Sequence, residues 1–424
     1  MLGRPSTIHA GPRRRLGTRA LLASAALTLL AACGGGGGSS SGSSTSSNSS
    51  PFTIGVILPL TGPFAVIGEA AQDGMQVTVD DLNKNQHGIL GRQVKLMVRD
   101  DAGDTAKAIA AAKELVDQDH VDFLFPGAFA SDALAILPYT TQRKVVTVTS
   151  TGSSDAGNVQ KFPYSFQLSV PFETYPKPIA ASIKQVAGDS ATKVGLFVSA
   201  EASGTAQGDV LNAALPKLGF SIVDYEKFDP NAKDVTPQIE KLKNAGADVV
   251  VLAAPGTTLR TVMTGFRDLA WKVPVVATNG TATGDIQALV PPEVASQFHA
   301  VVFRQYARSD PDQVQPQYVA YVKELKDAFG TLKNLGVSAL HSDIVKLVKW
   351  AYEKVGGTDQ DRVRATLESM STVTLPPNYF LVVANPRWTP SVHSTLNGDF
   401  TNFFWLVGVS PLVDGTFLGT PISS

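Results

Sequence analysis

A serine, Ser131, follows the short apolar run Phe123–Phe125 at the place where a buried strand would end. Open parallel sheets bind their ligands beyond the carboxyl ends of their strands, so a hydroxyl group at this position could contact a ligand. Together with backbone amides at the start of the next helix, such a hydroxyl can hold a carboxylate without a formal positive charge. The alternative is a structural role, because serine is also a favoured helix N-cap.

The sequence shows no pattern for nucleophilic, nucleotide or metal chemistry. Its single Gly-x-Ser-x-Gly match, residues 38–42, lies in a glycine-serine tract without a preceding strand, and no histidine has a triad context. The phosphate-binding glycine motifs are missing, and the six histidines have no paired ligand spacing. We therefore expect no enzyme activity, no cofactor and no metal, and keep an exported hydrolase as a less favoured alternative.

The first 32 residues contain five arginines and no acid, and residues 20–32 form an apolar run too short to span a bilayer. This arrangement is typical of a secretory signal peptide. The run ends Leu30-Ala31-Ala32-Cys33, which resembles the lipobox of bacterial lipoproteins, and Cys33 is the only cysteine. We expect cleavage after residue 32, lipid on Cys33 and a flexible tether over residues 33–50.

Charge and cysteine content limit the possible partners and the means of stabilisation. The chain has 36 basic and 37 acidic residues, so removal of the five leader arginines makes the mature protein acidic. We therefore expect no binding to nucleic acid. With no second cysteine, the fold must be stabilised without an internal disulfide, although it acts outside the cytoplasm.

Apolar runs alternate with helical patterns along the body, which predicts parallel sheets covered by helices on both faces. We expect strands at residues 52–58, 93–98, 123–125, 145–148, 194–198, 221–225 and 248–253. Helices are expected at residues 68–83, 106–118, 179–186, 208–218 and 236–244.

The alternation restarts after residue 173, so the predicted fold class is α/β with two doubly wound parallel-sheet lobes. Residues 51–170 and 302–385 would form the N-terminal lobe, and residues 171–301 and 386–424 the C-terminal lobe. Extended crossings are expected near Val170 and Val301. Two lobes joined by such crossings can close over a cleft by a hinge motion.

Three N-terminal segments together carry a family resemblance. They are Ile-Gly-Val-Ile-Leu-Pro-Leu-Thr-Gly-Pro-Phe-Ala-Val-Ile-Gly at 54–68, Gly-Ile-Leu-Gly-Arg at 88–92 and Arg-Asp-Asp-Ala at 99–102. This set resembles the leucine/isoleucine/valine-binding protein family of type I periplasmic binding proteins, over residues 52 to about 415. The resemblance implies a solute-binding protein that delivers a small ligand to an ABC transporter permease. It also implies that Thr151, Gly152 and Ser153 bind the ligand together with Ser131.

The sequence departs from the family at several expected ligand positions. Ile67 replaces an aromatic residue, Asn279 stands where an acid would meet a ligand ammonium, and Ser203 and Pro255 stand where tyrosines are found. Gln167 replaces an arginine before the first crossing. The carboxylate half of the site therefore looks retained and the ammonium half lost. If an acid does supply that charge, Glu173 and Glu201 are the nearest candidates in the second lobe.

Three phenylalanines, Phe64, Phe129 and Phe172, lie in or beside the same loops and could offer aromatic surface to a ligand. We therefore expect a small carboxylate or amide ligand, amino-acid-like, aliphatic or aromatic. The expected protein is exported and lipid-anchored to a bacterial membrane. A ligand sensor of the same fold, which signals through another protein, is the alternative.

Overall fold

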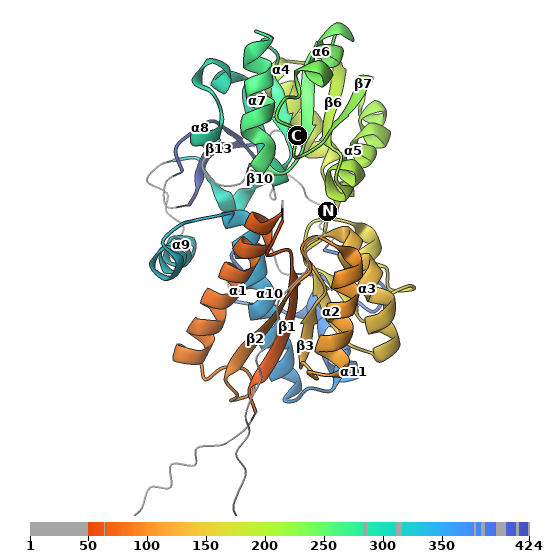
Figure 1. Ribbon diagram of the computed structural model, residues 1–424, viewed down its shortest axis with the longest axis vertical. Coiled ribbons are helices and arrows are strands. Elements are labelled where there is room, and N and C mark those ends of the chain that lie inside the picture. The colour runs from red at the N-terminus through yellow and green to blue at the C-terminus, as the bar shows by residue number, and fades with distance from the viewer. Residues whose placement is uncertain are drawn as a thin grey trace, which may run out of the picture. The chain divides into compact units, whose positions relative to one another are not determined.

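The structure is a computed structural model, and it describes residues 50–62, 64–282, 286–310, 316–376, 379–382, 386–395, 404–412 and 415–422. Contacts divide the chain into residues 1–48 and residues 49–424. The second of these units contains two lobes, each built on its own sheet (Figure 1).

The first lobe is built on a five-stranded parallel sheet with strand order β2-β1-β3-β4-β5. Its elements in chain order are β1 (Phe52–Leu58), α1 (Ala65–Asn85), β2 (Val94–Asp100), α2 (Thr105–Asp117), β3 (Phe123–Phe125), α3 (Ala130–Arg143), β4 (Thr147–Thr149) and β5 (Ser165–Gln167), joined later by α9 (Pro316–Phe329), α10 (Leu335–Val355) and α11 (Gln360–Glu368).

Side chains of β1 alternate between two hydrophobic cores, as expected for a strand buried on both faces. Ile54 and Val56 belong to the core that includes residues of α1 and α10, whereas Ile57 packs with Leu115 of α2 and Ile136 of α3. Helices therefore cover both faces of the sheet (Figure 1).

The helices α1 and α10 approach so closely that their backbones nearly touch. A Cβ atom added at Gly74 would lie 2.0 Å from the carbonyl oxygen of Ser338. One turn further along, the hydroxyl oxygens of Thr78 and Ser342 are 2.6 Å apart. Glycine at position 74 is thus what allows the two long helices to pack.

The second lobe contains an eight-stranded sheet with strand order β11-β13-β12-β10-β9-β8-β6-β7. Its elements are α4 (Pro176–Ala187), β6 (Lys193–Ser199), α5 (Ala202–Ala214), β7 (Ser221–Phe228), α6 (Thr236–Asn244), β8 (Val249–Ala253), α7 (Leu259–Asp268), β9 (Val275–Ala277), α8 (Ile286–Leu289), β10 (Phe298–Phe303), β11 (Ala307–Arg308), β12 (Phe404–Gly408) and β13 (Phe417–Pro421). The strand β12 runs antiparallel to β10 and β13, so this sheet is mixed. The predicted class, α/β in two lobes, is confirmed.

Two of the predicted lobe boundaries differ from the structure. Val301 does not mark a crossing, because it lies inside β10 opposite Leu406 of β12, and the second sheet continues to Arg308. Residues 386–395 do not join the second sheet: the rings of Trp388 and His393 lie 5.0 and 3.9 Å from that of Phe166 in the first lobe. The first crossing, near Val170, agrees with the break between β5 and α4.

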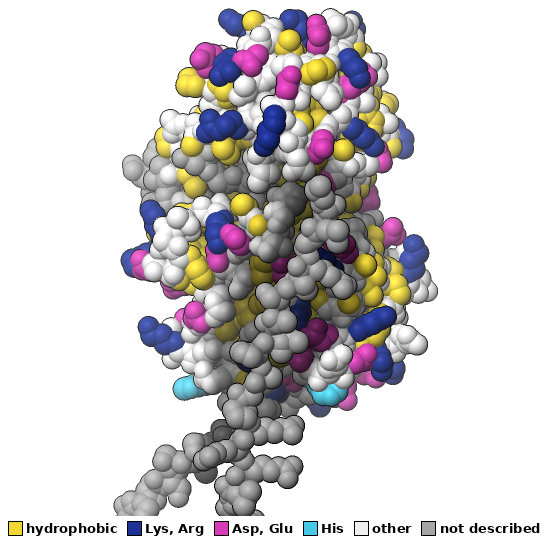
Figure 2. Space-filling view, in the orientation of Figure 1, with side chains coloured by type: hydrophobic (Ala, Val, Ile, Leu, Met, Phe, Trp, Pro, Cys, Tyr) yellow, Lys and Arg dark blue, Asp and Glu magenta, His cyan; other side chains and the backbone are white. Residues whose placement is uncertain are grey.

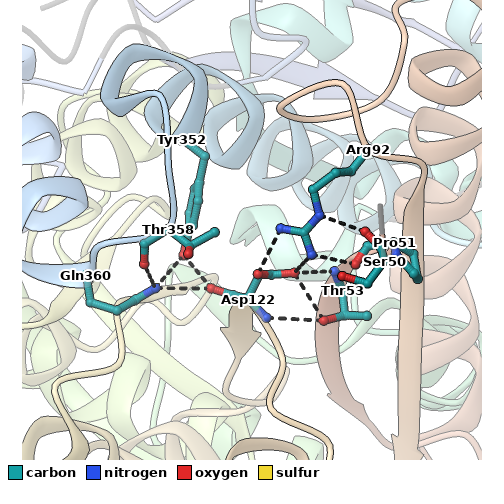
Figure 3. A network of polar contacts seen from close by, with 8 residues as sticks. All are labelled: Ser50, Pro51, Thr53, Arg92, Asp122, Tyr352, Thr358 and Gln360. Carbon is teal, nitrogen blue, oxygen red and sulfur yellow. Dashed lines mark hydrogen bonds and ion pairs between the residues drawn. The ribbon is translucent and has the colours of Figure 1, made fainter. Parts of the chain in front are cut away.

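The start of the body is fastened to the first lobe by Arg92 (Figure 3). Its guanidinium donates to the carbonyl oxygens of Ser50 (2.8 Å) and Pro51 (2.6 Å) and pairs with Asp122 at 2.8 Å. Asp122 also accepts from the backbone N–H of Thr53 at 2.8 Å. The carbonyl oxygen of Asp122 accepts from the hydroxyl of Tyr352 on α10 at 2.6 Å. This Arg92 clamp therefore connects residues 50–53 to β3 and α10.

Charged side chains of both signs are interspersed over both lobes on the face in view in Figure 2. This surface agrees with the nearly balanced charge of the whole chain. Such mixing keeps a protein soluble without creating a field of one sign.

Candidate functional site

A cavity of about 490 Å³ lies between the two lobes. Its wall is formed by the segments that follow β1, β3 and β4 in the first lobe and β6, β8 and β9 in the second. All six are parallel strands that point their carboxyl ends at the cavity, which is where sheets of this kind bind ligands. The start of α10 and the first crossing complete the wall.

On the first-lobe side, the N-terminus of α3 borders the cavity through residues 128–130. No side chain caps this helix, so its first amide N–H groups are left for another acceptor. Thr151 and Gly152, which follow β4, lie in the same wall. Amide donors at a helix start together with a hydroxyl suit an anionic or strongly polar group.

Gln167 supports this wall from behind. Its side-chain amide donates to the carbonyl oxygens of Thr151 (2.8 Å) and Ser153 (2.9 Å), which fixes the turn after β4. The ring of Phe172 lies directly on this turn, since a Cβ atom at Gly152 would be 2.2 Å from its Cε1 atom. The residue that stands in place of the family's arginine therefore shapes the site without lining it.

Six aromatic side chains give the cavity an apolar character. Phe64 and Phe129 meet edge to face, with ring centroids 5.0 Å apart. Phe303 stacks on Phe404 at 5.5 Å, and Tyr175 packs against the same ring at 4.9 Å. The aromatic lining residues are Phe64, Phe129, Phe172, Tyr175, Phe303 and Tyr306. Such a wall suits a ligand with an aliphatic or aromatic body.

Polar side chains gather on the second-lobe side. Glu201 caps α5 and accepts from the backbone N–H groups of Ser203 and Gly204. Burial raises the pKa of Glu201, and these two amide donors act against that rise. Gln207 and Asn279 line the cavity beside it. Among the described residues of the second-lobe wall, the acid is thus Glu201, whereas Glu173 does not line the cavity and accepts from the hydroxyl of Ser154 at 2.7 Å.

A single lysine, Lys333, lies among the described lining residues, and acids of the first lobe engage it. Its Nζ atom is 2.9 Å from Asp73 and 3.2 Å from Glu69. The positive charge at this edge of the cavity is therefore already balanced.

Most of the ligand-binding residues predicted from the sequence line this cavity. They are Phe64, Ile67, Phe129, Thr151, Gly152, Phe172, Ser203 and Asn279. Ser131 and Ser153 do not line it. Ser131 is exposed at the second residue of α3, with its hydroxyl 3.3 Å from Asp132. The amide N–H of Ser153 donates to Thr151 Oγ1, so Ser153 shapes the turn from outside.

Gln207 and Tyr175 also line the cavity, but no sequence pattern predicted either of them. Gln207 is the sixth residue of α5, and Tyr175 lies directly before Pro176 at the start of α4, so neither stands in a recognised motif. That they face the cavity is visible only once the bounds of α4 and α5 are known.

Two buried acids, Asp101 and Asp132, lie in the first lobe. Asp101 and Asp132 are almost fully buried, and each has one carboxylate oxygen without a hydrogen-bond partner among the described residues. Burial, with the nearby charge of Asp132, raises the pKa of Asp101 to about 6. Burial likewise raises the pKa of Asp132.

A raised carboxyl pKa makes the folded protein bind more protons than the unfolded chain, so stability falls as pH rises from about 4 to about 6. We expect Asp101→Asn to remove this loss, because the amide oxygen can still accept from Gly103. Urea unfolding should therefore show that the free energy of unfolding of the variant, relative to that of the wild type, increases between pH 4 and pH 7. Buried His341 and His393, whose pKa values desolvation lowers to about 4, act in the opposite direction in both proteins. If the free energy of unfolding depends on pH in the same way in the wild type and in Asp101→Asn, the raised pKa of Asp101 is contradicted.

The pattern of the family described as periplasmic binding protein matches residues 51–388. The chain belongs to this family. It is 30% identical to Leu/Ile/Val-binding protein homolog 3 of Brucella melitensis over 198 residues, 47% of this chain and 53% of that protein. The match thus spans about half the length of that relative. Leu/Ile/Val-binding protein homolog 7 of the same organism is 24% identical over 334 residues, 76% of this chain and 82% of that protein.

A solved structure shares the fold of this periplasmic binding protein. It is a solute-binding protein of an ABC transporter from Rhodopseudomonas palustris HaA2 in complex with p-hydroxybenzoic acid, with 20% identity and a TM-score of 0.69. The match covers 88% of this chain and 96% of that one. The predicted resemblance to the Leu/Ile/Val-binding group and the predicted fold are confirmed.

Membership of this family indicates a place outside the cytoplasm, in agreement with the predicted export. The predicted signal peptide and Cys33 lie outside the described residues. Within the part that the structure describes, no helix combines the length and apolarity needed to cross a membrane.

Proposed function

We propose that this protein is the solute-binding component of an ABC transporter and captures a small carboxylate- or amide-bearing ligand between its lobes. The observation that carries this is the interlobe cavity, where the uncapped start of α3 meets Thr151 and Gly152 opposite an aromatic wall. The amides and the hydroxyl bind the polar group, and the aromatic side chains hold the body of the ligand.

The relatives support the same ligand class. Two are named as Leu/Ile/Val-binding homologues, and the solved structure holds an aromatic monocarboxylate. Branched aliphatic amino acids and aromatic acids share a carboxylate on an apolar body. Glu201 lines the second-lobe wall, so it can act as the counter-ion of the ammonium group of an amino acid.

We place the protein on a bacterial membrane through lipid on Cys33, after cleavage of residues 1–32. Support comes from the lipobox-like Leu30-Ala31-Ala32-Cys33 and the glycine-serine tract behind it. Mass spectrometry of the membrane fraction tests this: a diacylated N-terminal cysteine is expected, and a Cys33→Ala protein that is processed normally would overturn it.

The ligand site is tested by Thr151→Val. Removing the hydroxyl of Thr151 should weaken binding of monocarboxylates about ten- to a hundredfold, because a hydrogen bond to a charged group contributes about 1.5–3 kcal/mol. Calorimetry with leucine, 4-methylpentanoate, benzoate and 4-hydroxybenzoate measures the change, and Thr151→Ser should restore most of the affinity.

The matched control is Ser131→Ala, which removes a hydroxyl from the same region but outside the cavity. It should leave the dissociation constants unchanged. If Ser131→Ala lowers the affinity and Thr151→Val does not, the carboxylate of the ligand does not bind at Thr151. If none of the four acids binds, the proposed ligand class is wrong.

A further inference from the structure

A buried amide, Gln207 of α5, lines the cavity. The side chain is only 7% exposed, and its Oε1 atom accepts from the hydroxyl of Thr278 at 2.7 Å. Thr278 is itself fully buried, and its hydroxyl holds the amide group of Gln207 in place. Among the described residues, the hydrogen bond found for this side chain is the one from Thr278, and its Nε2 group is open to the cavity.

A ligand that displaces water from this amide without offering it an acceptor leaves a polar group unpaired, which weakens binding. Because Gln207 lines the cavity, an acceptor atom of a ligand can satisfy it. The Asn279 side chain is similar: its Oδ1 atom accepts from the backbone N–H of Phe303 at 3.4 Å, which leaves its amide donors for the cavity.

An acceptor lies in the same wall. Both carboxylate oxygens of Glu201 already accept from backbone N–H groups of α5, which opposes the rise in its pKa that burial causes. A carboxylate oxygen has room for a further donor, so Glu201 can also accept from a ligand. The second-lobe wall thus offers a donor, Gln207, and an acceptor, Glu201, to the same ligand group.

The charges of the cavity limit what that group can be. A second carboxylate on the ligand would face Glu201, and the described lysine of the cavity, Lys333, is paired with Asp73 and Glu69. A hydroxyl or amino group meets no such repulsion, because it can donate to Glu201. A hydroxyl can in addition accept from Gln207.

We propose that Gln207 and Glu201 recognise a hydroxyl or amino group on the apolar body of the ligand, at the end opposite its carboxylate. This inference rests on the proposed function, in which the first lobe holds the carboxylate. The ligand is then a monocarboxylate with a hydrogen-bonding substituent on its apolar body. Unsubstituted acids and dicarboxylates are bound less well.

Four para-substituted probes test this on the wild-type protein: benzoate, 4-hydroxybenzoate, 4-aminobenzoate and terephthalate. Calorimetry at pH 7.5 should show 4-hydroxybenzoate binding at least about tenfold tighter than benzoate, because benzoate leaves Gln207 unpaired. 4-Aminobenzoate should also bind tighter than benzoate. Terephthalate should bind at least about tenfold more weakly than 4-hydroxybenzoate, because its second carboxylate meets Glu201.

The variant Gln207→Leu should reduce the preference for 4-hydroxybenzoate over benzoate to about threefold or less, with benzoate affinity kept or improved. Thr278→Val removes the hydroxyl that donates to the Oε1 atom of Gln207. It should lower the preference for 4-hydroxybenzoate because the amide group is then no longer held in its orientation. The control Gln76→Leu changes a glutamine of α1 that does not line the cavity, and should leave the preference intact.

The outcomes separate this inference from the proposed function. Equal affinities for benzoate and 4-hydroxybenzoate in the wild type, or tightest binding of terephthalate, would overturn the inference and leave the proposed function standing. A Gln207→Leu protein that binds benzoate normally and keeps the full preference would also overturn it. Failure of all four probes would overturn this inference, whereas the proposed function would still be decided by leucine and 4-methylpentanoate.

Discussion

The Gly74→Ala protein is expected to lose about 3 kcal/mol of its free energy of unfolding, at the upper end of the usual range for overpacking. The added methyl group would lie 2.0 Å from the carbonyl oxygen and 2.6 Å from the carbonyl carbon of Ser338. Because both are backbone atoms of α10, no side-chain rotation can relieve the overlap. The helices must separate, which also strains the contact between Thr78 and Ser342. Urea unfolding measures the loss.

Gly357→Ala is the matched control, because no atom lies within 4 Å of a Cβ atom built at Gly357. Its free energy of unfolding should stay within about 0.5 kcal/mol of the wild type. Equal stabilities of the two variants would mean that the α1–α10 contact is looser than the structure has it.

Asp122→Ala should destabilise the protein by about 2–3 kcal/mol, since it removes the acceptor of several hydrogen bonds at once. The guanidinium of Arg92, at 2.8 and 3.2 Å, and the backbone N–H of Thr53 would lose their partner. The two charged side chains are only 20% and 14% exposed, so water replaces the lost contacts poorly. Chemical unfolding of Asp122→Ala, Arg92→Met and the double variant gives the coupling energy.

An exposed pair provides the comparison. Arg267 and Asp268 contact each other at 2.7 Å, but their side chains are 41% and 50% exposed. Removing Asp268 should change stability by less than about 1 kcal/mol, as is usual for surface ion pairs. If Asp122→Ala is equally harmless, the Arg92 clamp does not stabilise the body.

The regular alternation of buried strands and helices is what made most of the fold predictable. The structure has β1 and α6 with the predicted bounds, because Pro51 and Pro59 flank β1, while Pro237 and Gly246 lie at the two ends of α6. The start of α5 was missed by six residues. Gly204 and Gly208 weaken the helical pattern, yet both are required by close contacts: a Cβ atom would lie 2.6 Å from Ser199 O and 2.5 Å from the Tyr225 hydroxyl, respectively.

The loops that line the site could be predicted from the sequence, but not which side chains of those loops face the cavity. The family resemblance pointed to Thr151, Gly152 and Asn279, and all three line the cavity. Ser131 was predicted to contact the ligand, but α3 begins at Ala130 and the serine side chain is exposed. A shift of one residue in the start of the helix decides this. Gln207 could not be found from spacing, since its role depends on Thr278, which is far away in the sequence and fixes its amide.

The Arg92 clamp determines where mechanical load enters the molecule. Ser50 and Pro51 are held at the amino-terminal edge of the first sheet, whereas the cavity lies at the carboxyl ends of the strands. A pull on the chain ahead of residue 50 is therefore shared by Arg92, Asp122 and Tyr352 inside one lobe. None of that force passes through the segments that join the lobes. Motion of the second lobe against the first is thus mechanically isolated from whatever the N-terminal chain is attached to.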